Sequence, residues 1–127
     1  MRLLLLSLLS VACIHANNFY YEYGQKVELT ELSNPRTANN NIAYYQKSNG
    51  KQVGVKKNEI LLKCNEGIAC LSILDAYNFA SVKALSRSIY LITLQETQNI
   101  FTYSQTLHNN AAIEFAHPNF VKERKRR

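Results

Sequence analysis

The sequence has little of the material from which most active sites are built. Its 127 residues contain one aspartate, Asp75, and only four glycines. It has no GxSxG nucleophile elbow, no HExxH motif, no glycine-rich phosphate loop and no paired carboxylates at a defined spacing. We therefore expect a protein that is not an enzyme and that holds no metal or cofactor.

Histidine is also scarce beyond the first sixteen residues, where only His108 and His117 occur. His117 precedes a proline at the end of an expected strand, so we interpret it as a strand-end residue rather than a general base. His108 is expected at the C-terminus of a helix, where a cation is favourable.

Residues 1–16 have the pattern of a secretory signal peptide. Arg2 gives a short charged region, residues 3–14 are mostly apolar, and Ala16 ends an acceptable cleavage site. The apolar run is too short to span a bilayer. Export to the periplasm or the medium is therefore expected. Two alternatives stay open, namely lipidation at Cys13 and a buried N-terminal helix. Membrane association is not expected unless Cys13 is lipidated.

Removal of such a leader would leave two cysteines, Cys64 and Cys70. An even number in an oxidising compartment favours a disulfide. The alternative is a pair of buried thiols. No histidine lies near them in the sequence, so the pair does not predict a metal site.

The net charge of +6 is concentrated at the C-terminus. Residues 122–127 hold five basic side chains and one acidic side chain, which leaves the body of the chain nearly neutral. The chain is therefore not expected to bind nucleic acid through a basic face.

Residues 17–57 are predicted to form an extension of β-hairpins. The first hairpin is rich in aromatic residues and turns at Gly24-Gln25. The second spans residues 42–55, and its Asn49-Gly50 pair is typical of a type I′ turn. Residues 33–41 are polar and predict a loop.

From residue 58 the pattern is β-α-β-β-α-β, which predicts a ferredoxin-like fold over 58–121, with two helices on one face of a four-stranded antiparallel sheet. Strands are expected at 59–64, 79–85, 89–94 and 112–116. The first helix is expected to be capped by Asn65, and the second by Thr97 or Asn99. Pro118 lacks an amide donor and is expected to end the last strand.

The sheet strands carry apolar residues on both faces, for example Ile60 and Leu62 opposite Leu61. A sheet with helices on one side only should be more polar on the other. The open face is therefore expected to be covered, either by the N-terminal hairpins or by another protein.

Four segments in this order resemble the N-terminal prodomain of subtilisin-like serine proteases, of the fervidolysin-like type. They are residues 58–63, 82–86, 89–92 and 113–120, and the last reads Ile-Glu-Phe-Ala-His-Pro-Asn-Phe. The resemblance covers about residues 58–121.

The resemblance implies a ferredoxin-like propeptide domain that helps a subtilisin-like serine protease to fold and then inhibits it. The partner would bind the open sheet face, and an extended tail would lie in its substrate cleft. The implied sheet positions are Leu61, Tyr90, Ile92 and Glu114, or their alternating neighbours. The implied tail positions are Pro118, Asn119, Phe120, Val121, Lys122, Glu123, Arg124 and Lys125.

The sequence departs from the family because the catalytic Asp, His and Ser blocks are missing. We expect a module that acts in trans, or the front piece of an interrupted proenzyme. The alternative function is an exported binding or structural module whose basic tail contacts a membrane surface or an acidic partner.

Overall fold

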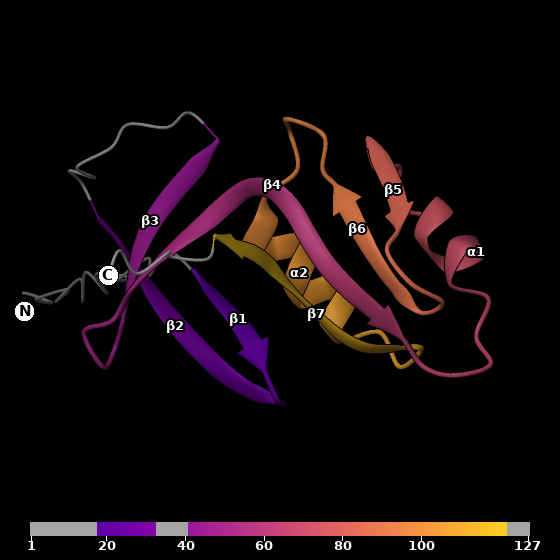
Figure 1. The fold of residues 1–127 in the computed structure, drawn as a ribbon, viewed down its shortest axis with the longest axis horizontal. Helices are drawn as coiled ribbons and strands as arrows, with labels where there is room; N and C mark the ends of the chain where they lie inside the picture. Colours follow the sequence, from indigo (N-terminus) through magenta and orange to yellow (C-terminus); the bar gives the residue numbers. More distant parts are fainter. Residues whose placement is uncertain (1–17, 33–40, 122–127) are drawn as a thin grey trace, which may run out of the picture.

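The computed structural model of the protein describes residues 18–32 and 41–121. These residues form seven strands and two short helices (Figure 1). The strands are β1 Phe19–Glu22, β2 Gln25–Glu31, β3 Ile42–Lys47, β4 Gln52–Cys64, β5 Ser81–Ala84, β6 Ile89–Thr93 and β7 Ile113–Val121. The helices are α1 Cys70–Asp75 and α2 Ile100–His108.

All seven strands belong to one antiparallel sheet in the order β1-β2-β3-β4-β6-β5, and β7 pairs with the other edge of β4. The long strand β4 connects the two halves of the sheet. Its first residues pair with β3 and its last residues pair with β6. The strand also crosses the boundary expected at residues 57 and 58.

The predicted four-stranded ferredoxin-like fold is therefore wrong. The expected order of elements is present as β4-α1-β5-β6-α2-β7, but the sheet has seven strands, not four. The physical reason lies in residues 52–64, which contain no proline or turn pair. The polar residues Lys56 and Lys57 separate two apolar segments, but they do not end the strand.

Both hairpin turns differ from the predicted ones. In the first, the central residues are Tyr23 and Gly24, with φ of 49° and 76°, rather than Gly24-Gln25. In the second, only Gly50 has a positive φ, at 85°, so Asn49-Gly50 is not a type I′ pair. The Gly50 amide donates to the Lys47 carbonyl at 2.9 Å, which gives a longer loop with glycine in the left-handed position.

Helix α1 is shorter than predicted and is not capped by Asn65. That side chain instead donates to the carbonyl of Ala111 at 2.7 Å. Helix α2 is capped by Asn99, whose Oδ1 accepts from the amides of Phe101 and Thr102. Of the two expected caps, Thr97 and Asn99, the structure has Asn99.

The core lies between the sheet and the helices. Its largest fully buried side chains include Ile60, Leu62, Ile92, Leu74 and Leu107. In Figure 1, α2 lies behind β4 and β7, and the opposite face of these strands looks toward the viewer. Helix α1 joins the same side as α2 because its first residue, Cys70, is bonded to buried Cys64.

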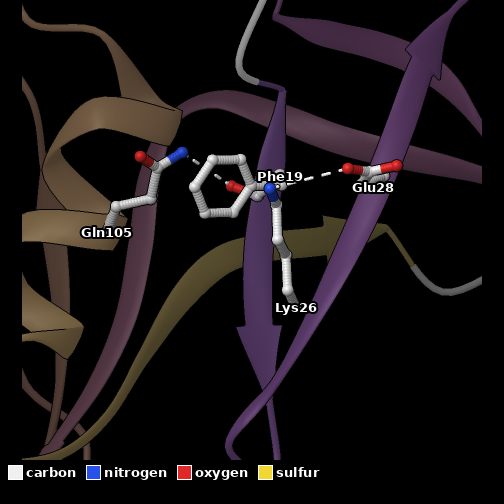
Figure 2. A network of polar contacts seen from close by, with 4 residues as sticks. All are labelled: Phe19, Lys26, Glu28 and Gln105. Carbon is white, nitrogen blue, oxygen red and sulfur yellow. Dashed lines mark hydrogen bonds and ion pairs between the residues drawn. The ribbon is translucent and has the colours of Figure 1, made fainter.

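The N-terminal hairpin packs on α2 and β7. Tyr20 is buried and lies against Phe120, with ring centroids 4.9 Å apart. Burial and the neighbouring Glu22 carboxylate raise the pKa of Tyr20 well above its usual range. Figure 2 shows Gln105 of α2 donating to the Phe19 carbonyl at 3.0 Å, with Lys26 lying over the Phe19 ring.

Candidate protein-docking face

The pairing of β4 with β6 decides which side chains look away from the helices. Ile60 pairs with Ile92, and both are fully buried. Leu61 pairs with Leu91, and both are partly exposed. Because alternate residues of a strand point to opposite faces, Leu61 and Leu91 lie together on the side without helices. We call this side, formed by β7, β4, β6 and β5, the open face.

The open face has an apolar centre and a charged border. Lys83 of β5 pairs with Leu91, and Lys63 of β4 pairs with Ile89. Lys63 also forms an ion pair with Glu114 at 3.3 Å. Exposed ion pairs contribute about 0–1 kcal/mol, so these charges would orient a bound partner more than they stabilise the fold.

The four sheet positions implied by the resemblance do not share one face. Leu61 is on the open face, and Glu114 reaches the same side through its ion pair with Lys63. Ile92 lies on the opposite, buried face, and Tyr90, which pairs with Leu62, lies there too. Their alternating neighbours Ile89 and Leu91 are the β6 residues on the open face. Alternation alone could not reveal this, because β6 is apolar on both sides.

Pro118 does not end the last strand, contrary to the prediction. Strand β7 runs from Ile113 to Val121, and its last two residues pair with Val55 and Gly54. The amide of Cys64 donates to Ser88 and that of Leu94 to Asn58. In these two bonds, Asn58 and Cys64 direct backbone groups toward β6, and by alternation Ile60 does the same. Pro118 pairs with Ile60, so its nitrogen points away from β4, toward the free edge of β7. A missing donor costs nothing there.

The implied tail is consequently divided. Pro118 is fully buried, and Asn119 donates to Glu59 Oε2 at 2.9 Å. Phe120 stacks near His117, and Val121 approaches Gly54. These four residues belong to the sheet. Lys122, Glu123, Arg124 and Lys125, like the rest of the basic tail, lie outside the described residues.

β4 is irregular opposite Asn119. Between Val55 and Ile60 the strand has extra residues relative to β7, so the register shifts there. Such a bulge increases local bending and twist. Lys56 and Glu59 lie in it and form an ion pair at 3.4 Å. The bend in β4 lets the first half of the sheet turn toward α2.

Cys64 and Cys70 lie at bonding distance and form a disulfide, with Cα atoms 6.0 Å apart. Both side chains are buried. The bond holds the short helix α1 against the end of β4. The predicted pairing therefore agrees with the structure.

The two histidines lie on either side of a groove beside β7. His117 stacks near Phe115, and its Nδ1 is 2.9 Å from the Pro118 carbonyl oxygen. His108 ends α2 as expected and stacks on Tyr21. Its Nδ1 is buried and has no hydrogen-bond partner within the described part of the chain. Burial lowers the pKa of His108, which disfavours the helix-end cation that was expected.

Within residues 18–32 and 41–121, no three metal-binding side chains come together. Over the same ranges, neither helix is long and apolar enough to cross a membrane. The signal-peptide prediction and Cys13 fall on residues outside the described part of the chain. Comparisons with protein-family models, curated proteins and solved structures found no match to this chain.

Proposed function

We propose that this chain is a propeptide-like module that binds a subtilisin-like serine protease, either in trans or as the front part of an interrupted proenzyme. The observation that carries the proposal is the open face, an apolar centre at Leu61 and Leu91 that neither helix covers. A further support is the resemblance of residues 58–121 to such prodomains.

Binding through this face would assist folding of the protease by mass action. A module that binds only the folded protease lowers the free energy of that state relative to the unfolded chain. Burying a leucine side chain fully contributes roughly 1.5–3 kcal/mol. Leu61 and Leu91 are partly buried already, so each has a part of that contribution to offer a partner.

Inhibition would require an extended segment in the substrate cleft of the protease, docked there as an added strand. Since Pro118 to Val121 are part of β7, this role passes to the residues from Lys122 onward. The proposal thus separates two functions, with affinity from the open face and blockage from the terminal residues.

The test is an inhibition titration of a purified subtilisin-like protease from the same source. Leu61→Asp should raise the inhibition constant about tenfold or more, because a buried charge without a partner is costly. Leu71→Asp is the matched control, since Leu71 is an exposed leucine on helix α1 and not on the open face. That control should inhibit as well as the unchanged protein.

A second variant that ends at Val121 should still bind the protease but no longer block it. Binding can be followed by displacement of a labelled full-length chain. If the Leu61→Asp variant inhibits as strongly as the unchanged protein, or if the full chain does not inhibit, the proposal is refuted.

A further inference from the structure

A groove of about 510 Å³ lies between the tip of the first hairpin and the start of β7. His108, at the end of α2, also lines it. The groove runs beside two strands that are near each other but not paired. No backbone hydrogen bond joins β1 to β7 in residues 18–32 and 41–121.

Both strands direct backbone polar groups away from their partners here. The Leu29 amide donates to the Asn18 carbonyl at 2.8 Å, and by alternation the backbone groups of Tyr21 point away from β2. On β7, the same alternation that frees Pro118 directs the amide and carbonyl of Ala116 away from β4. Ala116 lies between Phe115 and His117, which both line the groove. Ala116 is fully buried, however, so this stretch of backbone is not open to an added strand, and a ligand of the groove contacts its side chains.

The walls of the groove combine flat rings with negative charge. Tyr21 and His108 stack with centroids 4.2 Å apart, and Phe115 and His117 stack at 5.4 Å. Glu22 and Glu114 also line the groove, and no lysine or arginine of residues 18–32 and 41–121 does. A guanidinium group stacks on ring faces and pairs with carboxylates, so this lining is complementary to arginine.

The two carboxylates already have contacts in the free protein. Glu114 Oε2 pairs with Lys63 across the open face, and Glu22 Oε2 accepts from the Tyr20 hydroxyl at 3.2 Å. Glu114 remains half exposed, so a second cation can approach it. One lysine against two carboxylates leaves a net negative charge at the groove.

Tyr23 is an independent sign of a partner at this place. It stands at the hairpin tip beside the groove and is 99% exposed. It also has a φ of 49°, which is costly for a residue with a large side chain. Contacts with the described chain do not explain an aromatic residue in this position. Tyrosines that become buried on binding often dominate the energy of an interface.

We propose that this groove binds a segment of a partner protein that carries an arginine. Its guanidinium lies between the rings and the carboxylates, and Tyr23 closes over it. The inference does not depend on the identity of the partner of the open face.

The probe is the acetylated and amidated peptide Thr-Val-Arg-Val-Thr, added to the full chain labelled with ¹⁵N. Binding should shift the amide signals of the lining residues Tyr21, Tyr23 and Glu114. A peptide with citrulline in place of arginine keeps the shape and loses the charge, so it should bind about tenfold more weakly.

Three variants separate the contributions. Glu114→Gln should weaken binding roughly fivefold, the scale of one exposed ion pair. Lys63→Gln is its matched control, because it breaks the same internal ion pair but keeps the carboxylate, and it should bind at least as well as the unchanged protein. Tyr23→Ala should weaken binding about tenfold while retaining the dispersed amide spectrum of a folded chain.

Equal affinity for the arginine and citrulline peptides would overturn the proposal. So would signal shifts confined to residues away from the groove, or no shifts at millimolar peptide. A loss of affinity in Lys63→Gln equal to that in Glu114→Gln would also contradict it, since the ion pair rather than the carboxylate would then matter.

Discussion

The imidazole of His108 lies flat on the phenol ring of Tyr21, with 12° between the ring planes. The contact joins the last residue of α2 to the first strand of the hairpin, 87 positions earlier in the sequence. The hairpin is also held by the bond from Gln105 to the Phe19 carbonyl. His108 is thus part of the packing of the first hairpin.

The stability of the protein should fall as the pH drops below about 6.5, the ordinary pKa of histidine. The pKa of His108 is lowered in the folded state, so the unfolded chain takes up a proton first and is favoured at lower pH. The contribution is fully present above the unfolded pKa and is lost as the pH falls through the folded pKa. Urea unfolding at pH 7.5 and at pH 5 measures it.

His108→Phe should remove this part of the pH dependence, because phenylalanine retains the stack on Tyr21 and cannot take up a proton. His117→Phe is the matched control, in which His108 and its effect remain. An unchanged pH dependence in the His108→Phe variant would show that other groups cause it.

Reduction of the disulfide should lower the free energy of unfolding by about 2 kcal/mol, as expected for so short a loop. Thermal unfolding with and without a phosphine reductant measures the change. The double variant Cys64→Ala, Cys70→Ala should unfold at a similar temperature with and without the reductant. If the unfolding temperature of the unchanged protein is also the same with and without the reductant, the disulfide contributes nothing to stability.

Asn99→Ala should destabilise the protein by about 1 kcal/mol, because the amides of Phe101 and Thr102 lose their acceptor. Asn99→Asp keeps an acceptor oxygen at the helix start and should be close to neutral or slightly favourable. Chemical unfolding of the three proteins side by side gives the comparison. Equal losses in both variants would mean that Asn99 acts through something other than its cap.

Gly54→Val should destabilise the protein by roughly 1–3 kcal/mol, and Gly54→Ala by less. A Cβ at this position would lie 3.3 Å from Tyr44 Cε1 and 3.3 Å from Val121 Cβ. The added methyl groups of valine would push the end of β7 away from β4. Hydrogen exchange at the Val121 amide should speed up in both variants, and more in Gly54→Val than in Gly54→Ala. If neither variant differs from the unchanged protein, the neighbouring side chains move aside without a loss of stability.

Local signals in the sequence predicted the elements well where one residue decides the geometry. Asn99 begins α2 because its side chain can accept two amides, whatever surrounds it. Gly24 and Gly50 mark the two hairpins, although the turn types differ from those expected. Cys64 and Cys70 are six positions apart, and the short chain between them already holds them near each other.

The tertiary structure decided what depends on long-range pairing. The four-stranded sheet was predicted from the β-α-β-β-α-β order that begins at residue 58, whereas β7 pairs with β4 both before and after Lys56 and Lys57 and holds it together as one strand. The face of Ile92 depends on its register with Ile60, which no local pattern of an apolar strand can specify. Pro118 remains in a strand because its nitrogen points to an edge with which no strand of residues 18–32 and 41–121 pairs, and only the arrangement of β4, β6 and β7 creates that edge.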